Sequence, residues 1–218
     1  MGDSTVQPAT WFGDRAVLVQ VDSAAERESI ATSLTHRMPE ALIRRGMASV
    51  LIEMPAPDPR LLETVEHYLD EVDGTAANLH GQEEVHIAVD YNGDDLETTA
   101  SFFGVTRSDL IAAHTSQTWR VAMMGFAPGF GYLEPLDDPL LPWVTLPRRD
   151  NPRAQVLTGS VALAAGMSAV YPSPSPGGWH LLGTTTTQLF DPTDEASPAL
   201  LRPGLTVRFI DEDRARNP

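Results

Sequence analysis

Residues 159–183 read GSVALAAGMSAVYPSPSPGGWHLLG. Short apolar runs alternate there with glycine and proline, and they lie at Val161–Ala165, Ala169–Tyr171 and Trp179–Leu182. A fourth run follows at Val207–Ile210, and 13 of the 18 prolines and nine of the 16 glycines lie from Gly125 onward. Short strands separated by frequent turns are typical of a β barrel or sandwich. The second half of the sequence therefore predicts such a fold.

The N-terminal part alternates strand and helix signals. Valine recurs at period two over residues 17–21, and a second alternating run covers residues 50–54, so both predict strands. The sequence Ser23-Ala-Ala-Glu26 is a capping box that opens a helix toward His36. Asp58-Pro59 predicts the N-cap and first position of another helix, whose apolar face continues to Gly74. These signals predict an α/β domain.

The small, polar residues from Gly74 to Glu84 are the best candidate for a domain boundary. We therefore expect an α+β protein, with an N-terminal α/β domain at residues 1–82 and a β-barrel domain at residues 83–218. The second domain is expected to begin with a strand near residues 85–91, a helix at 96–103 that stops at Gly104, a helix capped by Thr106, and a strand at 119–124.

The composition excludes several classes of function. The 218 residues carry a formal net charge of -15, the wrong sign for binding nucleic acid or an anionic membrane surface by charge. All 15 basic residues are arginine, so a Walker A lysine and a Schiff base are excluded, and the absence of cysteine excludes disulfides and thiolate metal sites. The N-terminus lacks the features of a secretory signal, and we expect a soluble cytoplasmic protein without a membrane segment.

A glycine- and aromatic-rich segment, Gly125-Phe-Ala-Pro-Gly-Phe-Gly-Tyr-Leu133, is the first candidate site. Its glycines allow close approach to a ligand, and Phe126, Phe130 and Tyr132 could form an apolar wall or fix the loop. A barrel corner held together by aromatic packing explains the same residues equally well.

Two further loops carry anion-binding chemistry. Arg148, Arg149 and Arg153 concentrate positive charge in a short loop between prolines, where guanidinium groups could hold a carboxylate or a phosphoryl group. Exposed salt bridges are the alternative. Ser175, Gly177, Gly178 and Trp179 follow in the next loop, where consecutive glycine amides can form an anion nest, although a wide hairpin turn explains them too.

Among the six histidines, His114 is the candidate for chemistry, because it ends a predicted helix just before the strand that leads into the aromatic segment. A capping histidine is the alternative. The histidines and carboxylates show no metal-ligand spacing, so we predict no dedicated metal site.

The order of several motifs resembles the KipI family, whose members are also called allophanate hydrolase subunit 1 or the B subunit of 5-oxoprolinase. The resemblance covers nearly the whole chain and is carried by Phe12–Leu18, Tyr91–Leu96, Gly125–Leu133, Leu146–Arg149 with Pro152-Arg153, Gly159–Val161, Tyr171-Pro172, Ser175–Trp179 and Leu189–Asp191.

The resemblance implies a C-terminal cyclophilin-like barrel and a hydrolase that is active only in complex. It implies a KipA-type partner, also called the C subunit of 5-oxoprolinase or allophanate hydrolase subunit 2, and a third, LamB/YcsF-type subunit. The implied reaction is the opening of 5-oxoproline to glutamate with ATP and its magnesium, without biotin on this chain. On this basis Arg149 and His114 are the expected catalytic residues. Phe130, Tyr132, Arg148, Arg153, Ser175, Gly177, Gly178 and Trp179 are then expected to bind the substrate or its anion.

Other readings of the resemblance differ in substrate or class. Allophanate or another urea-like amide could replace 5-oxoproline. One branch of the family inhibits a histidine kinase instead, and the barrel type alone suggests a prolyl isomerase, which would need a single arginine over an apolar floor. The chain also has Met167, Ser168 and Thr184 where the family usually has glutamine, threonine and arginine, which implies a pocket with fewer polar contacts.

Overall fold

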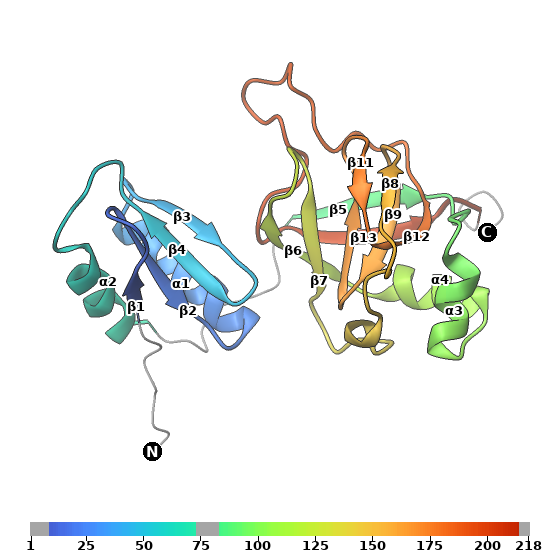
Figure 1. Cartoon of the computed structure of the whole chain (residues 1–218), viewed down its shortest axis with the longest axis horizontal. Helices are drawn as coiled ribbons and strands as arrows, with labels where there is room; N and C mark the ends of the chain where they lie inside the picture. Colours follow the sequence, from blue (N-terminus) through green and yellow to red (C-terminus); the bar gives the residue numbers. More distant parts are fainter. Residues whose placement is uncertain (1–8, 73–82, 214–218) are drawn as a thin grey trace. The chain divides into compact units, whose positions relative to one another are not determined.

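The structure is a computed structural model that describes residues 9–72 and 83–213. The chain divides into two compact units, Met1–Leu79 and His80–Pro218 (Figure 1). The boundary expected between residues 82 and 83 adjoins residues 73–82, and those residues, with His80 among them, lie outside the described part.

The first unit is an antiparallel sheet with two helices (Figure 1). Its strands run in the order β1-β2-β4-β3 and comprise β1 (Ala9–Trp11), β2 (Ala16–Gln20), β3 (Leu42–Arg45) and β4 (Ser49–Glu53). The helices are α1 (Ala24–Arg37) and α2 (Leu61–Asp70). The alternating valines of β2 are fully buried against apolar residues of both helices, so the period-two pattern points into this core.

The two helix starts predicted in this unit have different outcomes. The N-cap predicted at Ser23 is confirmed, since Ser23 Oγ accepts from Glu26 N at 3.1 Å. The reciprocal bond differs from that of a capping box, because Glu26 Oε2 accepts from Asp22 N, at 2.8 Å, one residue before the cap. The N-cap predicted at Asp58 is wrong, because α2 begins at Leu61. The Asp58 carboxylate instead accepts from Arg60 N at 2.9 Å and forms a turn ahead of the helix.

The second unit is a barrel, as predicted. Its sheet has seven strands in the order β12-β9-β10-β7-β6-β13-β5. The strands are β5 (Glu84–Val89), β6 (Trp119–Met124), β7 (Gly131–Pro135), β9 (Ser160–Ala164), β10 (Met167–Val170), β12 (His180–Thr184) and β13 (Thr206–Asp211). Asp90 and Thr184 exchange both backbone hydrogen bonds, at 2.9 and 2.8 Å, and so join the two edge strands.

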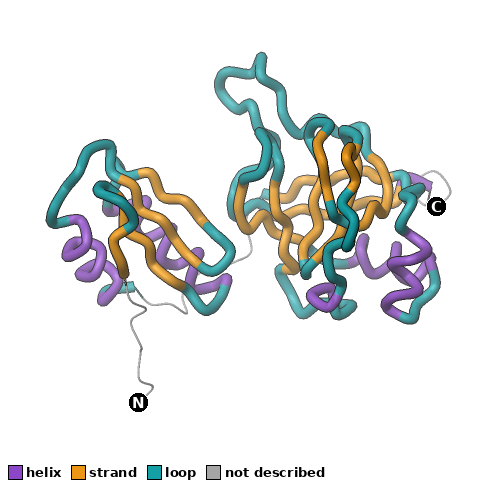
Figure 2. The backbone as a smooth tube through the Cα atoms, in the orientation of Figure 1, coloured by secondary structure: helices purple, strands orange, loops and turns teal. Residues whose placement is uncertain are grey.

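A separate two-stranded ribbon, β8 (Arg153–Val156) with β11 (Ser175–Gly177), accompanies the barrel (Figure 2). The remaining elements are α3 (Leu96–Phe103), α4 (Arg107–Ser116) and the short 3-10 helix η1 (Trp143–Thr145). Gly104 ends α3 in the left-handed conformation, and Thr106 with Asp109 forms the capping box of α4, as predicted.

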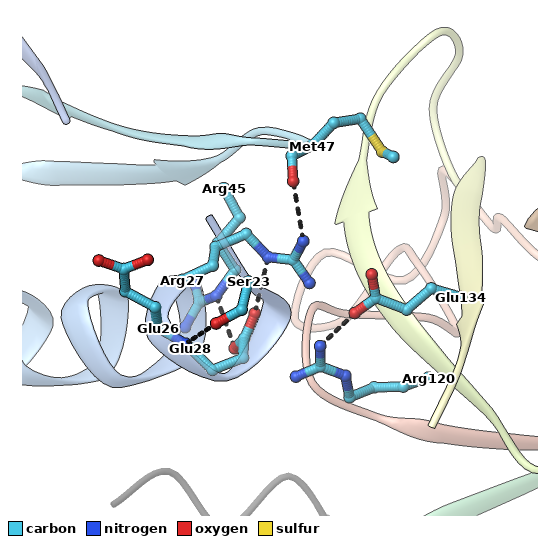
Figure 3. A network of polar contacts seen from close by, with 8 residues as sticks. All are labelled: Ser23, Glu26, Arg27, Glu28, Arg45, Met47, Arg120 and Glu134. Carbon is cyan, nitrogen blue, oxygen red and sulfur yellow. Dashed lines mark hydrogen bonds and ion pairs between the residues drawn. The ribbon is translucent and has the colours of Figure 1, made fainter. Parts of the chain in front are cut away.

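Each unit also carries polar ties of its own (Figure 3). In the first unit Arg27 donates to the Met47 carbonyl at 3.1 Å, and Arg45 pairs with Glu28 at 3.0 Å, so both bonds hold α1 to the β3–β4 hairpin. In the second unit Arg120 of β6 forms an ion pair with Glu134, which lies opposite it on the neighbouring strand β7.

None of the helices in the described residues is both long and apolar enough to cross a membrane.

Candidate functional site

A cavity of about 230 Å³ opens in the second unit, between the ribbon and the segment that leads from β6 to β7. It gathers six of the predicted site residues, which come from three separate segments of the chain: Phe130, Tyr132, Arg148, Gly177, Gly178 and Trp179. Phe126, Pro152, Tyr171 and Pro176 complete its lining. We call this cavity the aromatic pocket.

Packed aromatic rings form the wall of the aromatic pocket. The Phe130 ring lies 4.9 Å from Tyr132, 5.4 Å from Tyr171 and 6.0 Å from Trp179, measured between centroids, and each pair meets edge to face. Phe130 is only 2% exposed, so it is core as well as wall. The barrel-corner interpretation of the aromatic segment is confirmed, and the same packing also shapes the cavity. Its role in binding a ligand stays a prediction.

Glycine is required where backbone meets these rings. A Cβ on Gly177 would lie 2.3 Å from the Tyr171 hydroxyl oxygen, and one on Gly129 would lie 2.7 Å from Phe190 Cβ. Gly129 also has a φ of +79°, a conformation that favours glycine. The aromatic pocket therefore depends on bare backbone at Gly177, whereas Gly129 meets Phe190, which is not part of the lining.

Arg148 is the charged residue of the aromatic pocket. Its guanidinium carbon lies 6.0 Å from the centroid of Trp179, within the range of a cation–π contact. Within residues 9–72 and 83–213, it has no carboxylate within 4 Å. Burial raises the pKa of the neighbouring Tyr171, whereas the positive charge of Arg148 acts in the opposite direction.

Arg149 and Arg153 do not line this cavity, although they share its loop with Arg148. Both bind the buried carboxylate of Asp95: Arg149 donates to Oδ1, and Arg153 lies 3.0 Å from Oδ1 and 2.9 Å from Oδ2. Burial alone raises the pKa of Asp95, but the Arg153 and Leu181 N–H hydrogen bonds and the two positive charges outweigh it and lower that pKa. The catalytic role predicted for Arg149 and the anion-binding role predicted for Arg153 stay predictions.

Ser175 lies in β11, opposite Val156 of β8, and is not part of the pocket lining.

His114 lies at the end of α4 inside the barrel core and is completely buried. Its Nδ1 lies 2.7 Å from the Tyr91 hydroxyl, and its Nε2 lies 2.9 Å from Ser168 Oγ. Because Ser168 in turn donates to the Ala162 carbonyl at 3.2 Å, the chain of bonds fits a neutral imidazole that donates from Nε2. Burial lowers the pKa of His114 to about 3.

This environment bears on the expected role of His114 in proton transfer. A fully buried ring does not touch a ligand in the aromatic pocket, so direct transfer would need a rearrangement of the core. The role stays a prediction, and the contacts favour a structural one.

The three departures from the family pattern lie apart from Arg148. Met167 is buried in the apolar cluster beneath Phe130, Ser168 is the partner of His114, and Thr184 closes the barrel. None of the three belongs to the lining of the aromatic pocket.

Sequence reasoning missed Tyr171 as pocket wall and Asp95 as the partner of the two arginines. Asp95 lies in the Tyr91–Leu96 motif, 54 residues before Arg149, so only the fold reveals the pairing. Within the described part of the chain, no three histidine or carboxylate side chains gather as a metal site would require.

The arrangement has a definite chemistry. Aromatic walls, bare glycine backbone and one guanidinium that has no carboxylate partner within the described ranges suit a small molecule that carries a carboxylate.

Known proteins share both the sequence and the fold. The family model described as "Carboxyltransferase domain, subdomain C and D" matches residues 8–201. The 5-oxoprolinase B subunit of Escherichia coli O157:H7 is 34% identical over 168 residues, which cover 76% of this chain and 75% of that protein. The protein of the same name from Haemophilus influenzae is 40% identical over 131 residues, 59% of each chain.

Among solved structures, the crystal structure of TTHA0988 superposes with a TM-score of 0.70 at 32% identity. The match covers 90% of this chain but only 40% of that one. The family model and the identity to the curated relatives agree, and the chain therefore belongs to the carboxyltransferase subdomain C and D family that includes the 5-oxoprolinase B subunits.

Proposed function

We propose that this protein is the B subunit of an ATP-dependent amide hydrolase, and that the amide is the lactam of 5-oxoproline. It would act with a KipA-type subunit and with a LamB/YcsF-type subunit. Relatives that are named as B subunits of 5-oxoprolinase support this assignment, because the alignment with one of them covers three quarters of that relative's length.

One observation in the structure carries the proposal: Arg148 has no carboxylate partner among the described residues and lines an aromatic cavity of about 230 Å³. 5-Oxoproline is a small five-membered lactam with a planar amide group and one carboxylate. Its ring suits the faces of Trp179 and Tyr171, and its carboxylate suits the guanidinium fork of Arg148. The lactam carbonyl would then be oriented for the reaction in the assembled complex.

The nucleotide fits this cavity poorly. A triphosphate carries several negative charges, whereas the pocket presents one guanidinium that is not already bound to a carboxylate. ATP supplies the activation of the lactam oxygen as a leaving group, and we assign its binding to the assembled complex rather than to the aromatic pocket. This chain's own residues would bind the lactam and orient its carbonyl for attack by water.

The test is reconstitution. The chain is mixed with its KipA-type and LamB/YcsF-type partners from the same genome, and glutamate formation from L-5-oxoproline is followed with and without ATP. The proposal expects ATP-coupled glutamate that requires all three proteins. Turnover of allophanate or urea in place of 5-oxoproline, or glutamate formation without this chain, would contradict it.

The geometry also favours a second candidate. A prolyl isomerase needs a single arginine over an apolar floor, and Arg148 over Trp179 provides that arrangement, which was not evident from the sequence. A fold alone does not establish an activity, so this candidate rests on the single contact. Faster cis–trans exchange of a proline peptide with the purified chain, lost in Arg148→Ala, would favour it over lactam binding.

A further inference from the structure

The loop at residues 147–153 carries three arginines that face two different environments. Arg148 lines the aromatic pocket, whereas Arg149 and Arg153 bind the carboxylate of Asp95, whose side chain is 6% exposed. Neighbours in sequence are thus divided between a ligand cavity and an ion cluster around the buried Asp95.

The ion cluster consists of Asp94, Asp95, Arg149 and Arg153, and its positive and negative charges are equal in number. Arg153 Nη2 also lies 3.9 Å from the carboxylate of Asp94, so the cluster contains two carboxylates and two guanidinium groups. Arg148 is therefore the guanidinium of this loop whose positive charge is not matched among the described residues. The net charge at the mouth of the aromatic pocket is set by this division.

The backbone of the loop is held in place from several sides. The Arg149 N–H donates to the Gly178 carbonyl at 2.7 Å, and the His180 ring lies 3.0 Å from the Pro147 carbonyl. Asp95 itself accepts from Leu181 N at 2.8 Å, which ties the ion cluster to β12. Arg148 is therefore presented by an anchored loop rather than by a free one.

We propose that Asp95 is a specificity-determining residue, which withdraws Arg149 and Arg153 from the pocket so that it selects a small ligand with a single negative charge. The inference rests on the proposed function for its choice of ligand. Asp95 acts through the arginines and is a positioning residue, whereas Arg148 makes the contact. The physical basis is matching of charge: one guanidinium fork pairs with one carboxylate, whereas a multiply charged anion would need the two arginines that Asp95 holds.

The experiment compares three probes by calorimetric titration of the full-length chain: L-5-oxoproline, 2-pyrrolidone and inorganic pyrophosphate. The first two share a ring and differ by the carboxylate, and the third carries several charges. The wild-type protein should bind 5-oxoproline roughly tenfold to a hundredfold more tightly than 2-pyrrolidone, the usual gain from a charge-assisted hydrogen bond. Pyrophosphate should bind weakest.

Two variants separate the roles. Arg148→Gln should abolish the preference for 5-oxoproline over 2-pyrrolidone and leave 2-pyrrolidone affinity unchanged. Asp95→Asn should free Arg149 and Arg153 and raise the affinity for pyrophosphate relative to 5-oxoproline by about tenfold or more. A merely structural residue would weaken all three probes together and leave their ratio unchanged.

Asp95 is buried, and its replacement can unfold the protein. Asp94→Asn therefore serves as the second variant, because the Asp94 side chain is 80% exposed and yet belongs to the same ion cluster. It should shift the ratio of the two affinities in the same direction by a smaller factor.

Three results would overturn the inference: a wild-type preference for pyrophosphate, unchanged selectivity in Arg148→Gln, or an unchanged ratio in both aspartate variants. The outcome is separable from the proposed function. A reconstituted complex that consumes 5-oxoproline while the probe ratios stay flat would refute the inference alone. Selective binding of the monoanion by a chain whose complex leaves 5-oxoproline intact would refute the function alone.

Discussion

Gly177 lines the aromatic pocket at a point where the backbone leaves no room for a side chain. The Tyr171 ring beside it is 2% exposed and packed edge to face against Phe130, so it has little room to withdraw. The shape of the cavity is therefore sensitive to a single methyl group at this position.

Gly177→Ala should lower the free energy of unfolding by about 1–3 kcal/mol, because the added Cβ would lie 2.3 Å from the Tyr171 hydroxyl oxygen. Denaturant unfolding measures the change. Gly125→Ala is the matched control, since its nearest neighbour would be 3.8 Å away. The double variant Gly177→Ala with Tyr171→Phe should recover part of the loss. Equal stability of the two glycine variants would show that the contact is not restrictive.

His114 makes a second prediction at this scale. Its buried ring resists protonation until about pH 3, whereas an unfolded histidine takes up a proton near pH 6.5. The unfolded state therefore binds more protons between these values, and this residue lowers stability as pH falls through that window. Its full contribution is present above about pH 6.5.

The measurement is the free energy of unfolding against pH, in wild type and in His114→Asn. The wild-type curve should fall more steeply below about pH 6.5, by up to about 1.4 kcal/mol for each pH unit. His67→Asn, at a surface position whose side chain is 68% exposed, controls for the replacement of a histidine by asparagine as such. Parallel curves for wild type and His114→Asn would show that the buried ring does not resist protonation.

At the scale of elements, the capping residues illustrate what a local signal can and cannot decide. Thr106 and Asp109 exchange side-chain and backbone hydrogen bonds at the start of α4, in the spacing that predicts a capping box. Asp58-Pro59 carries an equally good signal for α2, yet the aspartate forms a turn with Arg60 N instead. A local motif names a helix start, while the surrounding packing decides which residue takes the role.

Thr106→Ala should reduce the free energy of unfolding by about 1 kcal/mol, since it removes one half of the capping box. Thr115→Ala on the same helix is the control: its hydroxyl bonds back to the Ile111 carbonyl at 2.9 Å, a contact that adds little to helix stability. Thermal denaturation of both variants gives the comparison. If Thr115→Ala costs as much as Thr106→Ala, the cap has no special weight.

For the whole molecule, short apolar runs predict the barrel strands well, because each run is long enough for one strand and too short for a helix. The order of those strands is less accessible. β5 pairs in parallel with β13, although the two strands lie at opposite ends of the sequence of the second unit. No local sequence signal predicts that pairing. Closure depends on Gly93 and Gly183, where an added Cβ would lie within 2.4 Å of backbone across the seam.

In the candidate site, too, local sequence predicts which residues take part but not how they are paired. Phe130, Tyr132, Arg148 and Trp179 could be named from the sequence because aromatic residues, glycine and arginine are dense in their loops. The sequence could not predict which of Arg148 and Arg149 lines the pocket, because adjacent residues in a loop have no periodicity that indicates where each side chain points. Long-range contact with Asp95 decides between them.

The central claim is that Arg148 holds the substrate of the assembled hydrolase, and steady-state kinetics of the reconstituted complex test it most directly. Arg148→Gln should reduce kcat/KM for L-5-oxoproline by roughly tenfold to a hundredfold, with most of the change in KM. Arg60→Gln, whose side chain is 82% exposed on the other unit, should match wild type. Wild-type kcat/KM in the Arg148→Gln complex would contradict the account.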